Sequence, residues 1–265
     1  MIIATTTQSS DIIDNCFHAF LQESGIKYVK RGKKGLHRLI QENEAEAIVV
    51  WNSDFPVVYT EGEKFFFHPS MAKNRIAAFR KFGALDPMIK AFDCQESDHI
   101  LDCTLGLGAD AIVASYFASQ GRIVGLESSA VVACVVKWGM KLYKSRMNWL
   151  DDAIRRIEVV NQDYNDYLAQ LPEDSFDIVY FDPMFRKPQL KSQAISPLRA
   201  LADHSPVNSQ AVQQAVRVAR KRVVLKETVN SGEFARLGFN NLMVSSNKRI
   251  AYGVIDIRTE EPRQK

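Results

Sequence analysis

The regular alternation of short apolar runs with longer helical segments after His99 constrains the fold more than any other feature of this sequence. The runs are rich in β-branched and aromatic residues, and each has the length of a buried strand. They cover residues 100–103, 123–127, 157–161, 176–181 and 223–226. Strands that alternate with helices pair in parallel, and the helices cover both faces of the sheet. The pattern therefore predicts a doubly wound, Rossmann-like α/β sheet with five parallel strands.

The last two apolar runs depart from this pattern. Residues 242–245 and 251–257 are separated by a short polar segment that leaves no room for a crossover helix. The two strands must therefore pair antiparallel. A parallel sheet that ends in an antiparallel hairpin is typical of class I methyltransferases, whereas a dinucleotide-binding Rossmann domain continues with parallel strands.

The first part of the chain has a different organisation. In order, we predict a strand at 2–5, helices at 11–23 and 36–43, and short strands at 47–51, 57–60 and 64–67. Turn residues separate the last three strands, which suits antiparallel pairing. A further helix is predicted to begin at Pro69-Ser70. We expect a small α+β lobe over residues 1–68 and a methyltransferase domain over residues 69–265.

Composition limits the class of protein. With 265 residues, 46% of them hydrophobic, the chain is long enough to bury a core. No apolar run approaches the roughly 18 residues of a spanning helix, so we expect a cytoplasmic protein without membrane contact. The four cysteines are widely spaced and have no histidine cluster beside them, which predicts reduced thiols and no metal site. The net charge of +3 is too small to identify a polyanionic partner.

A glycine-rich loop follows the first strand of the predicted parallel sheet. Gly106 and Gly108 allow a tight turn and let a ligand approach the backbone. The loop alone does not separate NAD from S-adenosylmethionine (SAM), because both cofactors use such turns. Asp102 and Asp110 favour SAM, since a carboxylate suits its cationic methionine end and repels a pyrophosphate.

Acidic residues also end the next two strands. A carboxylate at Glu127 can accept hydrogen bonds from both ribose hydroxyls. Residues 161–163, which end in Asp163, could hold the adenine amino group, and a dinucleotide does not need this third acidic strand end. Either carboxylate could instead be a surface group or a helix N-cap.

The fourth strand leads directly into Asp182-Pro183-Met184-Phe185. This segment has the form of the D/N-P-P-Y/F motif of methyltransferases that act on planar amino groups. The Asp182 carboxylate and the Pro183 carbonyl would grip the amino hydrogens, and Phe185 would stack on the acceptor ring. The alternative is a structural Asp-Pro turn. A second Asp-Pro-Met, at 86–88, precedes a helical run and is interpreted as a helix N-cap.

Together, the glycine loop, Asp-Pro-Met-Phe and the following Lys191-Ser192 resemble the ribosomal RNA small subunit methyltransferase J family over about residues 100–257. The resemblance implies SAM as donor and the exocyclic amine of a guanine in small-subunit rRNA as acceptor. It implies cofactor contacts at Ala109, Asp110, Glu127, Ser128, Gln162, Asp163 and Asp182. The chain departs from the family at Ala109, where arginine is usual, and at Arg186, where proline is usual.

Basic residues near the acceptor motif suggest a phosphate-bearing substrate, RNA or an assembled ribosomal subunit. They are Arg186, Lys187 and Lys191 after the motif, and Arg220, Lys221, Arg222 and Lys226 around the fifth strand. These residues could equally form a solvated face. Three other hypotheses stay open at this point: an N-methyltransferase for DNA or protein glutamine, a catalytically silent SAM-binding protein that docks on RNA or a ribosome, and a dehydrogenase.

Overall fold

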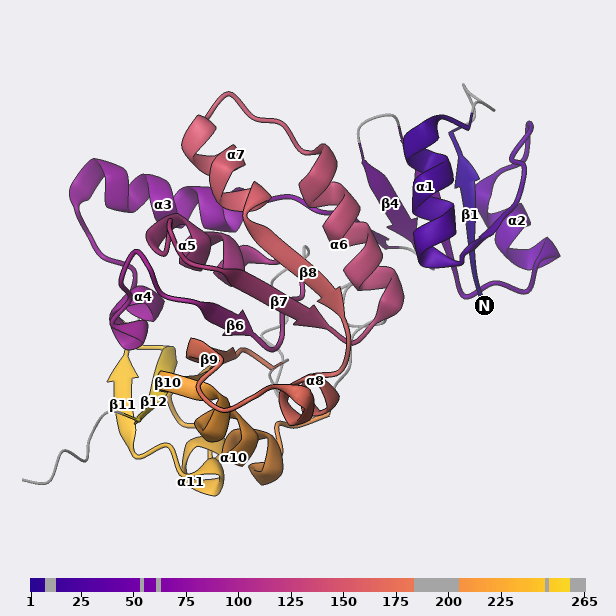
Figure 1. The fold of residues 1–265 in the computed structure, drawn as a ribbon. Helices are drawn as coiled ribbons and strands as arrows, with labels where there is room; N and C mark the ends of the chain where they lie inside the picture. Colours follow the sequence, from indigo (N-terminus) through magenta and orange to yellow (C-terminus); the bar gives the residue numbers. More distant parts are fainter. Residues whose placement is uncertain (8–12, 53–54, 61–62, 184–204, 246–247, 258–265) are drawn as a thin grey trace, which may run out of the picture.

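The computed structural model describes residues 1–7, 13–52, 55–60, 63–183, 205–245 and 248–257. Figure 1 shows two α/β units, each built on its own sheet. Among the described residues, no helix is both long enough and apolar enough to cross a membrane.

The larger sheet has seven strands in the order β11-β12-β10-β9-β6-β7-β8. Their bounds are β6 (Ile100–Asp102), β7 (Ile123–Glu127), β8 (Ile157–Asn161), β9 (Phe176–Phe181), β10 (Ala219–Thr228), β11 (Asn241–Val244) and β12 (Ile250–Asp256). Strands β8, β7, β6, β9 and β10 run parallel, and β12 pairs antiparallel with both β10 and β11. The predicted doubly wound sheet with a terminal antiparallel hairpin is therefore confirmed.

Helices cover both faces of this sheet (Figure 1). They are α3 (Ser70–Phe82), α4 (Pro87–Phe92), α5 (Ala109–Phe117), α6 (Ala130–Leu142), α7 (Asn148–Arg155), α8 (Tyr164–Gln170), α10 (Ser209–Val218) and α11 (Glu233–Leu237). Alternate residues of β9 face opposite sides: Ile178 and Tyr180 pack in the core with α3 to α7, while Val179 and Phe181 pack with α8, α10 and α11. Because both faces are covered, the strand is apolar at almost every position.

The smaller sheet belongs to the amino-terminal lobe and has the order β2-β1-β3-β4-β5. Its elements are β1 (Ile2–Thr6), α1 (Asn15–Ser24), β2 (Lys27–Tyr28), α2 (Leu36–Glu42), β3 (Ala47–Trp51), β4 (Pro56–Tyr59) and β5 (Lys64–Phe65). The predicted antiparallel pairing of β3, β4 and β5 is confirmed, whereas β1 pairs parallel with β2 and β3. Helix α1 begins later than predicted because the Asp14 carboxylate caps it, accepting the Phe17 N–H at 2.7 Å.

The lobe packs against helix α6, as Figure 1 shows. The Trp138 ring of α6 meets the rings of Phe20 and Trp51 edge-on, and its Nε1 donates to Oε2 of Glu23 at 2.8 Å. Helix α6 is buried on nearly all sides because the sheet covers one face and the lobe another. The predicted division of the chain at residue 68 falls between β5 and α3, and it stays a prediction.

Candidate functional site

The glycine loop joins β6 to α5 at the carboxyl end of the parallel strands. Gly106 and Gly108 have positive φ angles of 49° and 73°, which side chains rarely adopt. A Cβ atom on Gly108 would lie 2.3 Å from the Cε of Met140, so helix α6 closely approaches the loop. Both glycines therefore serve the turn, and Gly108 also allows the close packing of α6.

Glu127 ties the loop to the end of the neighbouring strand. Its Oε2 accepts the Gly106 N–H at 3.2 Å, and its Oε1 accepts the Ser129 N–H at 2.9 Å. The Asn161 side-chain amide donates to the carbonyls of Glu127 and Ser128 at 2.8 and 3.1 Å. The carboxyl ends of β6, β7 and β8 are thus linked by hydrogen bonds around one buried carboxylate.

Asp102 is buried at the end of β6, where its Oδ1 accepts the Thr104 N–H at 3.0 Å. Burial raises the pKa of Asp102 to about 8, and the nearby carboxylates of Asp110 and Asp182 add to this effect. A cation placed beside Asp102 would stabilise its ionised form and so oppose both effects on the pKa. The buried carboxyl groups of Asp102 and Glu127 therefore fit a ligand with a cationic end and hydroxyl groups, as SAM has.

The third strand end provides a helix cap. Asp163 caps the start of α8, and its Oδ1 accepts the N–H of Asn165 at 2.8 Å and the Asn165 side-chain amide at 2.9 Å. The N-cap alternative considered for Asp163 is thus present in the structure. Gln162 is half-buried beside it, Ser128 is exposed after β7, and Ala109 is the first residue of α5.

Asp110, the second residue of α5, lies within a cluster of charges. Its Oδ1 accepts a short hydrogen bond from Arg75 of α3. Its Oδ2 accepts from the Tyr180 hydroxyl and from Nζ of Lys226, both at 2.8 Å. Burial alone would raise the pKa of Asp110, but Lys226 and Arg75 outweigh burial and lower it well below its usual range. Asp110 is therefore an ionised partner of two basic side chains.

Asp182 follows β9 and contacts the glycine loop directly. Its backbone N–H donates to Oγ1 of Thr104 at 2.6 Å, and its Oδ2 accepts from Nζ of Lys226 at 2.7 Å. Burial raises the pKa of Asp182 to about 6; Lys226 opposes this shift and Asp110 adds to it. The acceptor motif and the cofactor loop therefore meet, as their strand positions predict. Pro183 is half-buried beside Asp182.

Four residues expected near the acceptor lie outside the described residues. They are Phe185, Arg186, Lys187 and Lys191.

The prediction that basic residues of the fifth strand gather near the acceptor motif is wrong for three of them. Arg222 is in register with Ile178, toward the amino-terminal end of β9 and away from Asp182. Acidic partners neutralise these side chains at that end: Arg220 pairs with Asp177, Lys221 with Asp98, and Arg222 with Asp256. Lys226 lies at the site end of β10, but its ammonium group is directed at two carboxylates.

Arg75 of α3 is a site residue that no sequence motif indicates. Its Nε and Nη2 donate to Asp86 at 2.8 and 2.9 Å, while Nη1 contacts Asp110. Asp86 also caps α4 as predicted, accepting the Met88 N–H at 2.9 Å. No local pattern could reveal the contact with Asp110, because it depends on the packing of α3 against α5.

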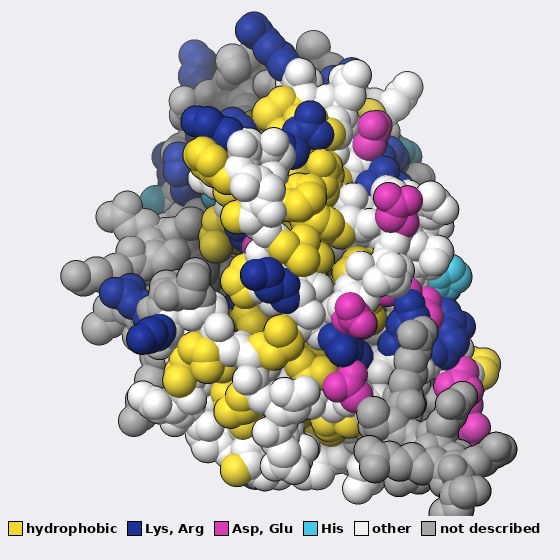
Figure 2. Space-filling model, turned by 90° about the vertical axis from the view of Figure 1, so that its left-hand side faces the viewer, with side chains coloured by type: hydrophobic (Ala, Val, Ile, Leu, Met, Phe, Trp, Pro, Cys, Tyr) yellow, Lys and Arg dark blue, Asp and Glu magenta, His cyan; other side chains and the backbone are white. Residues whose placement is uncertain are grey.

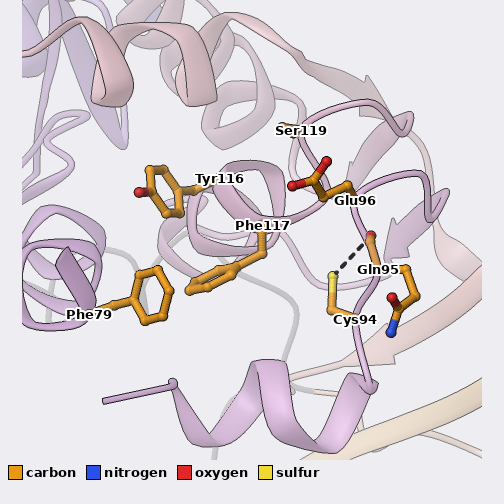
Figure 3. A pocket seen from close by; sticks show the side chains of 7 residues that line it. All are labelled: Phe79, Cys94, Gln95, Glu96, Tyr116, Phe117 and Ser119. Carbon is orange, nitrogen blue, oxygen red and sulfur yellow. Dashed lines mark hydrogen bonds between the residues drawn. The ribbon is translucent and has the colours of Figure 1, made fainter. Parts of the chain in front are cut away.

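A separate cavity of about 330 Å³ lies near the amino-terminal ends of β6 and β7 (Figure 3). Phe79, Tyr116 and Phe117 flank one side and Cys94, Gln95 and Glu96 the other, with Ser119 nearby. The lining comes from α3, from the segment before β6, and from the last turn of α5 with the residues that follow it. The cavity therefore shares no residue with the glycine loop or the acceptor motif.

The face that carries α3, α4 and β11 has a band of hydrophobic side chains among scattered basic residues (Figure 2). Exposed side chains here include Phe82 of α3, Leu85 between α3 and α4, and Leu242 and Val244 of β11. None of them contributes to the contacts around Asp182. Within the described ranges, no group of His, Cys, Asp or Glu is arranged to hold a metal ion.

Comparison with known proteins identifies the family of this chain. Residues 36–249 match a family model described as "Putative SAM-dependent methyltransferase". The chain is 38% identical to the uncharacterized protein YpiP of Bacillus subtilis, over 96% of this chain and 98% of that protein.

The chain is also similar to proteins named ribosomal RNA small subunit methyltransferase J. Identity is 27% with the Hydrogenovibrio crunogenus protein, over 64% of this chain and 63% of that protein. It is 26% with the Francisella philomiragia protein, over 73% and 81%. The matched region thus covers less than two thirds of the length of the Hydrogenovibrio crunogenus protein.

Among solved structures, a SAM-dependent methyltransferase from Neisseria gonorrhoeae superposes with a TM-score of 0.69. Sequence identity is 17%, and the match covers 98% of both chains. At this identity the match supports the fold, which is that of a class I methyltransferase.

Proposed function

Because this chain belongs to the SAM-dependent methyltransferase family and is an enzyme of that class, we propose that it methylates an exocyclic amino group of an RNA base. The specific acceptor in this proposal is the N2 amine of a guanine in small-subunit rRNA. The contact between Asp182 and Thr104 carries the proposal, because it places the acceptor motif against the cofactor loop.

The cofactor residues of this proposal surround the glycine loop and the adjacent strand ends. SAM supplies a methyl group on a cationic sulfonium, which is already a strong donor. Asp102 would face the methionine end and Glu127 the ribose hydroxyls. The full proposed set is Asp102, Gly106, Gly108, Ala109, Asp110, Glu127, Ser128, Gln162, Asp163 and Asp182. Asp110 would act indirectly, since its carboxylate is occupied by Arg75 and Lys226.

The acceptor amine needs orientation, because conjugation with the ring delocalises its lone pair. The Asp182 carboxylate and the Pro183 carbonyl would accept its two hydrogens and turn the lone pair toward the methyl group. As the nitrogen gains the methyl group it becomes cationic, and the negative charge of Asp182 stabilises that developing charge. Phe185 would stack on the base.

RNA as the substrate class is supported by similarity to the methyltransferase J proteins. The basic residues Arg186, Lys187 and Lys191, which directly follow the acceptor motif, add to this support. Lys226 was expected to bind RNA, but its position between two carboxylates favours a role inside the site.

The test is transfer of labelled methyl from SAM to separate pools of small ribosomal subunits, deproteinised rRNA, DNA and protein. We expect label in rRNA or subunits, and loss of that label with Asp182→Ala. Label in DNA or protein would show that the acceptor is a different macromolecule, and the proposed mechanism would still apply to its amino group. Transfer that survives in Asp182→Ala would overturn the proposed role of the carboxylate.

A further inference from the structure

A continuous chain of ion pairs connects helix α3 to the proposed catalytic carboxylate. It runs Asp86, Arg75, Asp110, Lys226, Asp182, and we call it the charge chain. Its members come from α3, α5, β10 and the segments that precede α4 and follow β9. The charge chain therefore joins two helices, one strand and two connecting segments around the site.

Lys226 occupies the central place in the charge chain. Its side chain is only 19% exposed, and Nζ lies 2.8 Å from Oδ2 of Asp110 and 2.7 Å from Oδ2 of Asp182. Burying an ammonium group is costly, and an apolar residue at a buried strand position would avoid that cost. The other buried face of β10 is indeed apolar at Val223 and Leu225. A lysine here thus points to a function beyond stability.

We propose that Lys226 is a positioning residue that keeps the Asp182 carboxylate ionised and oriented toward the acceptor amine, and that Arg75 fixes Lys226 through Asp110. This inference rests on the proposed role of Asp182. Lys226 reaches Asp182 by a single charged hydrogen bond, which constrains one oxygen and leaves the other to accept from substrate. The two bonds of Arg75 to Asp86 in turn hold its guanidinium in place.

Several charged and titratable groups act on Asp182 together. Lys226 on β10 lowers the pKa of Asp182, while Asp110 on α5 raises it. Asp102 on β6 is a further buried carboxyl group within electrostatic reach, and Tyr180 on β9 and Tyr252 on β12 are buried hydroxyls around the same cluster. Because Lys226 and Asp110 have opposite signs, their removal should shift the ionisation of Asp182 in opposite directions.

The first experiment measures the pH dependence of kcat/KM for methyl transfer. Lys226→Met should move the acid limb of the profile upward by about one pH unit or more, which lowers the rate at pH 7 by about twofold or more, and the lost orientation of Asp182 should lower it further. Asp110→Asn should move the same limb downward, because it removes a negative neighbour and leaves Lys226 to Asp182. Lys226→Arg should restore part of the rate and most of the wild-type profile, since it retains the charge.

Lys221→Met provides a matched control. Lys221 lies on the same strand and forms a buried ion pair with Asp98, but toward the opposite end of that strand. Loss of this pair should reduce stability and leave the pH profile unchanged. An effect of Lys226→Met that Lys221→Met reproduces would assign Lys226 a structural role only.

A second readout requires neither cofactor nor turnover. Carbon NMR of labelled aspartate carboxyls in the protein alone should show the Asp182 titration near pH 6, shifted upward in Lys226→Met and downward in Asp110→Asn. This measurement also separates Asp182 from Asp102, whose titration we expect near pH 8. It requires only that the variants fold, which circular dichroism checks, and Asp110→Asn carries the test if Lys226→Met does not fold, since it should shift the Asp182 titration downward.

The outcomes distinguish this inference from the proposed function. Opposite shifts in both readouts support the positioning role. If Asp182→Ala abolishes transfer but Lys226→Met leaves the Asp182 titration in place, the inference on Lys226 is overturned and the proposed function stands. If Asp182→Ala retains full transfer, the proposed role of Asp182 itself fails.

Discussion

The backbone N–H of Gly106 donates to Oε2 of Glu127 at 3.2 Å, so the glycine loop and the end of the neighbouring strand share one carboxylate. The second oxygen, Oε1, accepts the Ser129 N–H at the start of the next helix. A carboxylate can accept hydrogen bonds at both of its oxygens, which matches the two hydroxyls of a ribose. Glu127 therefore shapes the loop, and we propose that it also binds the ribose of the cofactor.

Glu127→Gln should weaken SAM binding by about tenfold to a hundredfold, because hydrogen bonds to a charged acceptor are among the stronger ones. Glutamine keeps one acceptor oxygen for the loop and loses the second acceptor and the charge. Isothermal titration of SAM measures the change. Glu158→Gln on β8 is the matched control, because that carboxylate is exposed and pairs with Arg122 at the other end of the strands. Equal affinities for both variants would contradict the assignment of Glu127.

The raised pKa of Asp102 leads us to predict that SAM binding releases a proton near pH 7. With a pKa of about 8, the Asp102 carboxyl is largely protonated in the free protein at pH 7. A cationic ligand favours the ionised form, so affinity should rise as pH increases from 6 toward 8 and then level off. Asp182 is already mostly ionised at pH 7 and contributes little.

The proton release appears as a dependence of the binding heat on the ionisation enthalpy of the buffer. Asp102→Asn should bind SAM without that dependence and with an affinity that varies less between pH 6 and 8. Binding heats that are independent of the buffer in the wild-type protein would show that the cationic end of SAM lies elsewhere.

The strand ends of the site could be predicted from the sequence, because apolar runs mark β7, β8 and β9 and the site residues follow them directly. Strand β10 was predicted too short, since its first half carries Arg220, Lys221 and Arg222. These side chains are accommodated in the strand because each has an acidic partner from a distant segment. Local hydrophobicity cannot reveal such compensation.

The charge chain was beyond prediction for a related reason. Asp182 and Asp110 stand out in their motifs, but the contact of Arg75 with Asp110 joins positions 35 residues apart on two helices. It exists because α3 packs along α5, where Phe79 contacts Phe117 at a ring-centroid distance of 4.7 Å. A sequence shows which side chains are charged, whereas their partners follow from helix packing.

Gly108→Ala should destabilise the protein by about 1–2 kcal/mol, chiefly through the backbone. The positive φ of 73° is unfavourable for alanine whatever the space available. The nearest atom to the new Cβ is the terminal methyl of Met140, which can move aside. Addition of Met140→Ala should therefore recover little of the loss in denaturant unfolding. Gly232→Ala is the control, because that glycine has a φ of −70° and open space around it. Full recovery in the double variant would show that packing dominates.

Gly139→Ala in α6 should also destabilise the protein, but for the opposite reason. Alanine in a helix interior is favoured over glycine by about 1 kcal/mol, so propensity alone predicts a gain. The new Cβ, however, would lie 2.3 Å from the Cβ of Phe67, an atom that cannot move without its backbone. Forced overpacking of this kind costs about 1–3 kcal/mol, which outweighs the propensity.

The choice of the second variant depends on which atom of Phe67 the new Cβ at position 139 would contact. Phe67→Ala retains its Cβ and should not rescue Gly139→Ala, whereas Phe67→Gly removes that atom and should recover part of the lost stability. A double-mutant cycle by denaturant unfolding measures the coupling between the two positions. Rescue by Phe67→Ala would place the clash in the aromatic ring instead. In that case a movement of the Phe67 side chain alone would make room between α6 and the segment that joins β5 to α3. The amino-terminal lobe would then be held less rigidly against the methyltransferase sheet than a contact with the Phe67 backbone would hold it.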